Sequence, residues 1–271
     1  MPETTNGRVT IDIQDGVADV RLVRTDKMNA LDDAMFAALI AAGERLKTEK
    51  GLRAVVLSGE GRAFCAGLDM GNFGKMASGE RSGGAGLVDT PRTASGANRA
   101  QNAVMVWRDI PVPVIAAVHG VALGGGFQLC LGADMRFVTP DAKMAVLEIK
   151  WGLVPDMAGI ALLRGLVRDD VARDLSYTGR IFTGEEAHRL GIATRVCADP
   201  YADALAAARE IAAKNPAAIR ANKRLLNLMA DGDQQAILLA ESVEQGALIG
   251  SPGNIEAVMA NMEKRAPVFQ D

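Results

Sequence analysis

The alternation of apolar and polar residues near the N-terminus predicts a β-hairpin. Residues 9–13 alternate between apolar and polar side chains, and residues 18–22 repeat the alternation after the pair Asp15-Gly16. A period of two is typical of strands that bury one face, and Asp-Gly is a favoured two-residue turn. We therefore expect two short antiparallel strands at the start of the chain.

The following segments switch between helical and continuously apolar patterns. Residues 32–50 place apolar side chains at helical spacing, and residues 98–110 are also helix-like. Each is followed by a short apolar run, at 53–58 and 114–118, which indicates a buried strand. Buried strands that alternate with helices are typical of the α/β class.

Two stretches depart from this order. Residues 71–97 have little periodicity and are rich in glycine and serine, so we expect a surface loop, either an active-site lid or an insertion without a role. From about residue 201 the pattern becomes helical, with four candidate helices at 204–214, 217–229, 234–248 and 254–264. We therefore divide the chain into an α/β core, 1–200, and a helical region, 201–271.

Composition and charge narrow the possible functions. The 271 residues are 49% hydrophobic and 23% charged, which is enough for a sizeable core. The net charge is −3 and no lysine- or arginine-rich block occurs, which argues against nucleic acid or a membrane surface as partner. No apolar run approaches the roughly 20 residues of a membrane span, and the first twelve residues lack a signal-peptide stretch. A cytoplasmic location is the default expectation.

The cysteines and histidines do not suggest a metal centre. Cys65, Cys130 and Cys197 are widely spaced, form no CxxC pair and are accompanied by only two histidines. We expect reduced thiols, no disulfide framework and no metal. Cys65 is expected to be a packing thiol and His119 a structural residue.

Two glycine-containing segments follow predicted strands and are candidates for binding an anionic oxygen. The first is FCAGLD, 64–69, and the second is HGVALGGGFQ, 119–128. Glycines let backbone N–H groups approach a ligand, and a helix that begins near Gly125 directs its positive end toward the same space. Two N–H groups from separate loops could hold the oxygen of an enolate. Close packing of a strand on a helix explains such glycines equally well.

A third segment, 147–159, carries two carboxylates. Glu148 and Asp156 bracket an apolar stretch that is broken by glycine and proline, so one straight helix through both is not expected. A loop could bring both to one apolar pocket, which would raise a carboxylate pKa toward the range useful for acid–base catalysis. Local sequence alone favours Asp156 as a helix N-cap. Glu148 could instead pair with Lys150 or Arg136.

In this order and spacing, the three segments resemble the crotonase (enoyl-CoA hydratase/isomerase) superfamily. The resemblance also includes DKMNAL at 26–31, TGEEAHRLG at 183–191 and EKRAPVF at 263–269, so it covers most of the chain. Thr25 stands where many relatives have proline. The resemblance implies a spiral of repeated ββα turns with a C-terminal helical trimerisation region, which assembles as a homotrimer or a dimer of trimers.

The resemblance also implies roles for particular residues in binding an acyl-coenzyme A thioester. The backbone N–H groups of Leu68 and Gly125 match the oxyanion hole that receives the thioester oxygen. The backbone of Ala66 matches the contact with adenine. Lys27 and the tail from Lys264 to Phe269 match coenzyme A contacts, the tail reaching a neighbouring subunit, although both lysines could equally be solvated surface charges. Coenzyme A is part of the substrate, and no separate cofactor is expected.

The acid–base residues distinguish members of the superfamily. The hydratase pattern places glutamates at the positions of Gln128 and Glu148, and an amide can orient water but cannot accept a proton. The dienoyl-CoA isomerase pattern uses the Glu148 position with an aspartate eight residues later, where this chain has Asp156, although it carries aspartate at position 128. The dehalogenase pattern needs a histidine within 98–110, which is absent.

We therefore expect isomerisation of an enoyl-CoA or 3,5-dienoyl-CoA by Glu148 and Asp156, with Gln128 as an orienting amide. One alternative is hydration of a trans-2-enoyl-CoA with Glu148 alone. Another is an acyl-CoA-binding protein with little catalysis. Trp107 and Trp151 could line an acyl pocket, but filling of the core is the preferred interpretation.

Overall fold

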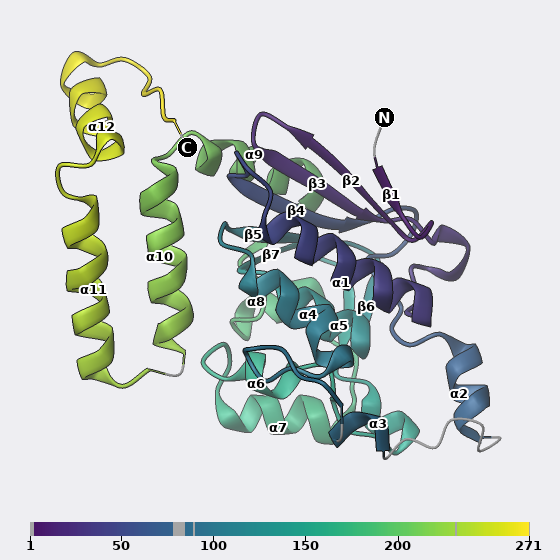
Figure 1. Cartoon of the computed structure of the whole chain (residues 1–271). Helices are drawn as coiled ribbons and strands as arrows, with labels where there is room; N and C mark the ends of the chain where they lie inside the picture. The colour runs from purple at the N-terminus through teal and green to yellow at the C-terminus, as the bar shows by residue number, and fades with distance from the viewer. Residues whose placement is uncertain (1–2, 78–84, 89, 231, 271) are drawn as a thin grey trace.

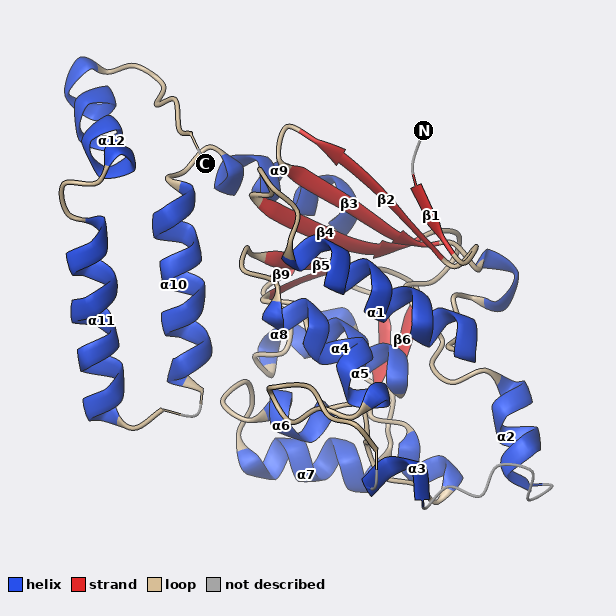
Figure 2. Cartoon of the chain, in the orientation of Figure 1, coloured by secondary structure: helices blue, strands red, loops and turns tan. Residues whose placement is uncertain are grey.

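A seven-stranded sheet forms the centre of the protein. The computed structural model describes residues 3–77, 85–88, 90–230 and 232–270. The first three strands are antiparallel and the rest of the sheet is parallel (Figure 2). In spatial order the strands are β1 (Glu3–Thr5), β2 (Val9–Gln14), β3 (Val17–Leu22), β4 (Ala54–Gly59), β5 (Val114–Val118), β7 (Met135–Val138) and β9 (Arg195–Val196). The hairpin and the two buried strands predicted from the sequence are confirmed.

Two of the predicted helices are also confirmed, and their ends have clear causes. Helix α1 (Asp33–Lys47) begins where the side chain of Asp32 accepts a hydrogen bond from the N–H of Met35. Helix α4 (Arg99–Asp109) begins at a reciprocal capping box between Asn98 and Gln101. Such caps satisfy N–H groups that the first turn of a helix leaves without acceptors. Helices α1 and α4 pack against each other beside the sheet.

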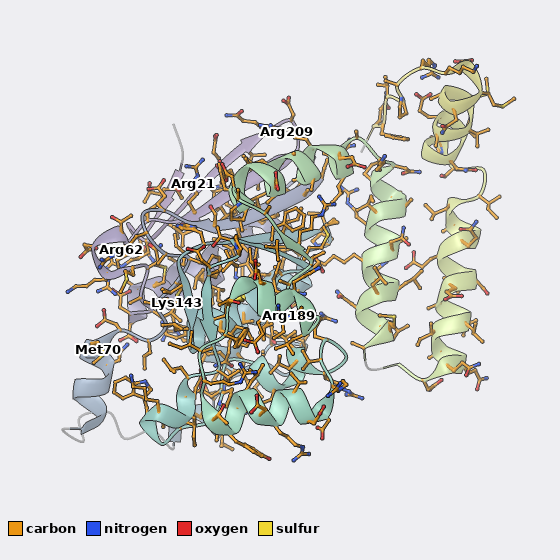
Figure 3. The ribbon with its side chains drawn as sticks, turned by 180° about the vertical axis from the view of Figure 1, so that it is seen from behind. Arg21, Arg62, Met70, Lys143, Arg189 and Arg209 are labelled. Atoms are coloured by element: carbon orange, nitrogen blue, oxygen red, sulfur yellow. The ribbon has the colours of Figure 1, made fainter. Side chains whose placement is uncertain are left out.

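Helix α9 (Pro200–Ala212) packs on the sheet through small side chains. Ala204 and Ala208 are fully buried against Val56 and Phe137. Alanine allows close approach of a helix to strands, which is consistent with the low aromatic content. Seen from behind, α9 lies across the strands, with Arg209 on its outer surface (Figure 3). The division of the chain at residue 200 stays a prediction.

A second, smaller sheet carries the segments that were singled out from the sequence. Strands β6 (Val121–Leu123) and β8 (Lys143–Ala145) are parallel, and single bridges join Leu31 to Leu68 and Cys65 to Ala122. Helix α5 (Gly125–Leu131) follows β6 directly. These pairings bring the two glycine-containing segments side by side. The sequence did not predict this sheet, because three-residue strands give no periodicity.

The region 71–97 contains more regular structure than predicted. Helix α2 (Met70–Ala77) and a single turn, α3 (Ala85–Val88), occupy part of it. The expectation of an irregular loop is therefore wrong for these residues, while 78–84 and 89 lie outside the described residues. Gly71 and Gly74 weakened the helical pattern of α2, because glycine is a poor helix former.

The C-terminal region is helical, as predicted. The remaining helices are the 3₁₀ turns η1 (Thr25–Lys27) and η2 (Glu148–Trp151), then α6 (Gly159–Leu163), α7 (Asp169–Thr178), α8 (Gly184–Arg189), α10 (Pro216–Met229), α11 (Gln234–Leu248) and α12 (Pro252–Glu263). Helix α10 is attached to the core by an ion pair of 2.8 Å between the buried Lys223 and Asp134. Helices α11 and α12 lie away from the sheet (Figure 1). No described helix is long and apolar enough to cross a membrane.

Candidate active site

A single cleft receives residues from the three sequence segments. Its cavity volume is about 200 Å³. One wall is formed by the turn at 66–68, a second by the turn at 123–125 and a third by the loop 147–157. The lining comprises Phe36, Ala66, Gly67, Leu68, Met70, Leu87, Ala100, Leu123, Gly124, Gly125, Leu147, Glu148, Trp151, Leu153, Val154, Asp156 and Met157.

The bridge between Leu31 and Leu68 sets the direction of one backbone donor. The N–H of Leu31 donates to the carbonyl of Gly67 at 2.8 Å, and the N–H of Asp69 donates to the carbonyl of Leu31 at 3.1 Å. Successive N–H groups in an extended chain face opposite sides. The N–H of Leu68 therefore faces away from Leu31, and Leu68 lines the cleft.

Gly125 supplies the second donor. The N–H of Gly124 donates to the carbonyl of Ala145 at 3.0 Å, whereas Gly125 is the first residue of α5, where N–H groups lack intrahelical acceptors. A Cβ atom on Gly67, which has a φ of +91°, would lie 2.5 Å from the carbonyl oxygen of Leu123 and 3.7 Å from the nitrogen of Gly125. Glycine at position 67 thus lets the two donor segments approach each other. Leu68 and Gly125 both line the cleft, and two backbone donors at one site are what an oxyanion hole requires.

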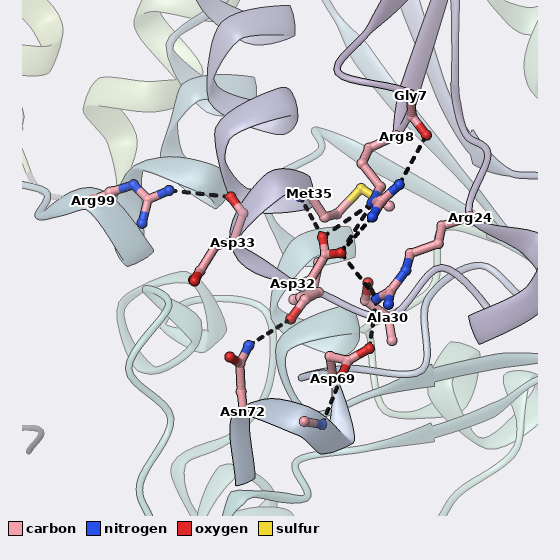
Figure 4. Close-up of polar contacts among 12 residues, drawn as sticks. Gly7, Arg8, Arg24, Ala30, Asp32, Asp33, Met35, Asp69, Asn72 and Arg99 are labelled. Atoms are coloured by element: carbon pink, nitrogen blue, oxygen red, sulfur yellow. Dashed lines mark hydrogen bonds and ion pairs between the residues drawn. The ribbon is translucent and has the colours of Figure 1, made fainter. Parts of the chain in front are cut away.

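A group of ion pairs holds the segment that carries Leu68 (Figure 4). Arg24 forms a 2.7 Å ion pair with Asp69 and a 3.5 Å ion pair with Asp32, and it also donates to the carbonyl of Ala30. The N–H of Gly71 and the guanidinium of Arg24 lower the pKa of Asp69. The chain on both sides of Leu31 is thereby fixed to the residue after Leu68. This role of Arg24 was not predicted from the sequence.

Glu148 is buried at the inner wall of the cleft, with 9% of its surface exposed. Its Oε1 accepts a 2.6 Å hydrogen bond from the amide of Gln128, and its Oε2 has no hydrogen-bond partner among the described residues. Burial raises the pKa of Glu148, and the charge of Asp156 acts in the same direction, while the bond from Gln128 opposes the shift. The alternative prediction, that Glu148 forms an ion pair with Lys150 or Arg136, is therefore wrong. Arg136 donates instead to the carbonyls of residues 192 and 133.

Gln128 is turned into the protein and does not line the described cleft. It is 1% exposed, and its Oε1 accepts hydrogen bonds of 2.9 Å from the N–H groups of both Met157 and Gly159. A Cβ atom on Gly159 would lie 2.7 Å from Gln128, so glycine is needed for this approach. One amide therefore connects Glu148 with the loop that follows Asp156.

Asp156 lines the cleft, and its side chain does not cap a helix. The N-cap position of α6 is Ala158, in a left-handed conformation and without a side-chain hydrogen bond. The N-cap interpretation favoured by local sequence is therefore wrong. The chain between the two carboxylates is a 3₁₀ turn followed by a loop, which agrees with the expectation that no single helix spans them.

The proposed coenzyme A contacts are only partly brought together in one chain. Ala66 lines the cleft. Lys27 ends η1, Lys264 lies at the C-cap of α12, and neither belongs to the lining formed by the described residues. The carbonyl of Phe269 accepts a hydrogen bond of 3.3 Å from Arg53. The roles of Lys27 and of the tail stay predictions.

The remaining candidates divide into core and cleft residues. Trp107 is fully buried, as expected, but Trp151 is 40% exposed and lines the cleft, so the expectation of a core position is wrong for it. Cys65 is fully buried, and burial raises the pKa of its thiol to about 12, as expected for a packing residue. His119 contacts the carbonyl of Gly61 at 2.9 Å and does not line the described cleft.

Comparison with known proteins identifies the class to which this fold and cleft belong. Residues 12–271 match the sequence model of the enoyl-CoA hydratase/isomerase family. The chain belongs to this family and is an enzyme of the enoyl-CoA hydratase/isomerase type.

Individual relatives agree with this assignment. The chain is 36% identical over 256 residues to "Probable enoyl-CoA hydratase echA6" of Mycobacterium tuberculosis, covering 94% of this chain and 96% of the relative. It is 28% identical over 262 residues to the mitochondrial methylglutaconyl-CoA hydratase of Mus musculus, covering 94% and 80%.

Solved structures show the same crotonase fold. A crystal structure from Streptomyces coelicolor A3(2), which its name places among the enoyl-CoA hydratases, superposes with a TM-score of 0.89 at 32% identity, covering 100% of this chain and 96% of that chain. An enoyl-CoA hydratase from Polaromonas sp. JS666 superposes with a TM-score of 0.86 at 27% identity, covering 97% and 100%. The fold class implied by the sequence motifs is confirmed.

Proposed function

We propose that this enzyme moves a double bond in an enoyl-CoA, with a 3,5-dienoyl-CoA as the preferred substrate. One observation carries the proposal: Glu148 and Asp156 both line the cleft, whereas Gln128, the position of the second hydratase carboxylate, is an amide turned into the protein. A two-carboxylate site can remove a proton at one carbon and return it at another. An amide cannot take part in such a transfer.

The proposed reaction has two proton transfers. The thioester oxygen accepts hydrogen bonds from the N–H groups of Leu68 and Gly125, and one carboxylate removes a proton from the acyl chain. The electron pair of the broken C–H bond is delocalised into a dienolate, whose negative oxygen the two donors stabilise. The other carboxylate then gives a proton to a carbon farther along the chain. The proton count is balanced, and no other reactant is consumed.

Two features support a reactive Glu148. Its Oε1 is occupied by the amide of Gln128, so Oε2 is the oxygen left for proton transfer. Its raised pKa, caused first by burial, brings the carboxyl group closer to neutral pH, where a group that must both take and give a proton is most effective. The same position would also suit the activation of water.

Hydration of a trans-2-enoyl-CoA is the second candidate. The relatives named above as hydratases favour it, and Glu148 alone would then activate the water. The third possibility, an acyl-CoA-binding protein with little catalysis, finds no support in these comparisons. The two reactions differ in their need for Asp156, which gives a direct test.

The deciding experiment measures wild-type protein and Asp156→Asn with a 3,5-dienoyl-CoA and with crotonyl-CoA. We expect fast isomerisation and slow hydration by the wild type, and a loss of about 10²–10⁴ in isomerisation rate in the variant. Asp170→Asn, which changes an exposed aspartate paired with Arg168, should have wild-type activity. Fast hydration by the wild type that Asp156→Asn leaves unchanged would decide for the hydratase.

A double variant tests whether the two carboxylates act together. Glu148→Gln should also reduce isomerisation about 10²–10⁴-fold while acyl-CoA binding stays close to wild type. Glu148→Gln combined with Asp156→Asn should lose far less than the product of the single effects, because members of one relay are not additive. Multiplicative losses would show that the two groups act independently.

A further inference from the structure

Asn29 is fully buried and lies in a left-handed stretch of the backbone. Its φ is +56°, and that of Met28 before it is +49°. Among residues that carry a side chain, asparagine is one of the few that adopt this conformation readily. In this stretch the carbonyl of Met28 accepts a 2.9 Å hydrogen bond from the N–H of Ala66. Position 29 therefore favours asparagine or glycine on backbone grounds alone.

The side chain of Asn29 contacts a different turn of the chain. Its Nδ2 donates hydrogen bonds of 3.0 and 2.8 Å to the carbonyls of Glu60 and Ala63. Its Oδ1 is buried and has no hydrogen-bond partner among the described residues. A Cβ atom on Gly59 would lie 2.8 Å from Nδ2, so glycine there leaves space for the amide. An unpaired buried carbonyl costs free energy, which indicates that the two donated bonds are what this position requires.

The turn at 60–63 leads directly into the segment that carries the proposed donor, the N–H of Leu68. One edge of this segment is bridged to the smaller sheet at Cys65. The other edge is bridged to Leu31, two residues after Asn29. Asn29 thus holds the beginning of the segment through its side chain, and its neighbours hold the edge. A shift of the turn would therefore displace Leu68, which follows within a few residues.

We infer that Asn29 is a positioning residue for the reaction: its amide fixes the turn at 60–63 and thereby places the N–H of Leu68 against the thioester oxygen. The inference rests on the proposed function in one respect, because it assumes that this oxygen lies between Leu68 and Gly125. It applies to isomerisation and to hydration, since both develop negative charge on the thioester oxygen. Asn29 does not line the described cleft, so it acts through the backbone and not on the substrate.

The first test removes the amide and keeps the backbone conformation accessible. Asn29→Gly can adopt a φ of +56° but cannot donate to the turn. With the enoyl-CoA that the wild type converts fastest, we expect kcat to fall about 10- to 10²-fold with a small change in KM. The matched control is Asn102→Ala, since Asn102 is a buried asparagine of α4 that does not line the described cleft. Wild-type kcat in a folded Asn29→Gly would overturn the inference.

A bound thioester gives a spectroscopic test of the donor. The infrared stretching frequency of an isotope-labelled carbonyl in butyryl-CoA, which is saturated, falls as hydrogen bonds to its oxygen strengthen. Bound to Asn29→Gly, this frequency should shift toward that of the free thioester, whereas Asn102→Ala should give the wild-type value. A protein that is only less stable keeps the wild-type frequency in its folded fraction. An unchanged frequency in Asn29→Gly would therefore contradict a positioning role.

Asn29→Asp provides a test by pH. An ionised aspartate would direct an oxygen at the two carbonyls and repel them, whereas a protonated one can donate its O–H to one of them. The kcat of this variant relative to the wild type at the same pH should therefore rise as the pH falls. A ratio that does not change with pH would count against the amide donors. Failure of both Asn29 variants to fold would show a purely structural role and would likewise reject the inference.

The same measurements separate this inference from the proposed function. If the wild type neither binds nor converts an enoyl-CoA, the assignment of the cleft itself fails. If Gly125→Val loses turnover while Asn29→Gly keeps it, the proposed oxyanion hole stands and the positioning role of Asn29 is wrong.

Discussion

Gln128 donates a 2.6 Å hydrogen bond to Oε1 of Glu148, and the oxygen of the same amide receives the N–H groups of Met157 and Gly159. The side chain thus determines which oxygen of Glu148 is free and fixes the chain just after Asp156. A single amide connects the segments that carry the two proposed catalytic carboxylates. This arrangement requires a donor and an acceptor on one side chain, which explains how glutamine can serve at a position where the hydratase pattern has glutamate.

Gln128→Glu should change the balance between reactions. One oxygen of the new carboxylate can still accept from Met157 and Gly159, but the other would face Oε1 of Glu148, so the two groups must share a proton. We expect the variant to hydrate crotonyl-CoA faster than the wild type, because it has a second carboxylate beside Glu148. Initial rates of crotonyl-CoA hydration by the variant and the wild type, measured at several pH values, test this expectation.

The matched control removes the hydrogen bonds without adding charge. Gln128→Leu leaves two buried N–H groups without an acceptor, and it should lower the free energy of unfolding by about 1–3 kcal/mol for each N–H that is left unsatisfied. Hydration should not increase in this variant. If Gln128→Leu and Gln128→Glu hydrate crotonyl-CoA equally well, the second carboxylate has no role in that reaction.

Gly125→Val should damage the oxyanion hole. The added side chain would meet Leu31 and Met157 at less than 3 Å, so the start of α5 must move away from its present position. Loss of one oxyanion donor typically costs about 10²–10³ in rate. Gly74→Val is the matched control, because Gly74 is exposed on α2 and a side chain there meets no atom within 4 Å. Full activity of Gly125→Val, with acyl-CoA bound elsewhere in a crystal, would exclude this oxyanion hole.

Arg24→Met should lower turnover through Leu68 and have little effect on substrate affinity. Arg24 pairs with Asp69 at 2.7 Å, next to the proposed donor, and a donor displaced by a fraction of an ångström stabilises the transition state poorly. We expect kcat to fall about 10- to 10²-fold with a small change in KM. Arg8→Met removes a cation that pairs with Asp32 at 2.8 Å, and so it serves as the control with near wild-type kcat. Equal losses in both variants would indicate general destabilisation.

Strong local patterns explain why much of the fold was predictable. The helices within 204–264 and the hairpin at 9–22 have clear periods, and their ends carry caps that can be recognised in the sequence. Helix α2 escaped prediction because glycine weakens its pattern. The sheet of β6 and β8 escaped because its pairs join residues 22 positions apart. Long-range pairing of short strands leaves no local signal.

In the candidate site, too, residues within local motifs were predictable, whereas contacts between distant segments were not. The motifs around Leu68, Gly125, Glu148 and Asp156 were recognised in the sequence, and the cleft contains all four. The inward orientation of Gln128 could not be predicted, since it depends on N–H groups 29 and 31 residues away. The ion pair of Arg24 with Asp69 likewise joins segments that have no local relation.

The exposed side chains of α11 predict assembly. Leu238, Leu239 and Val243 lie on a helix without buried residues, and Leu239 is 65% exposed. Clusters of exposed apolar side chains are typical of protein interfaces. With the family resemblance, they predict a homotrimer or a dimer of trimers, which light scattering at micromolar concentration can measure. Leu239→Glu should shift the protein to smaller species, whereas Glu241→Gln on the opposite side of the same helix should not. A monomeric wild type would contradict the prediction.

Glu148→Gln should stabilise the enzyme that it inactivates. Burial raises the pKa of Glu148 in the folded protein above its pKa in the unfolded chain. At a pH between these two pKa values, the folded protein keeps the proton on Glu148, whereas the unfolded chain has released it. The free energy of unfolding contributed by this group therefore falls as pH rises through the window. The variant cannot ionise, and its amide oxygen can still accept the bond from Gln128.

We therefore expect a Tm above that of the wild type near pH 8, where the wild-type protein must hold an ionised, buried carboxylate. The difference should shrink as the pH falls below about 4, because the wild-type carboxyl is then mostly protonated in both states. Thermal unfolding across this range checks the prediction, with Glu241→Gln, an exposed glutamate on α11, as the control. A constant Tm difference at all pH values would show that the ionised Glu148 carries no cost, and the raised pKa would then be wrong.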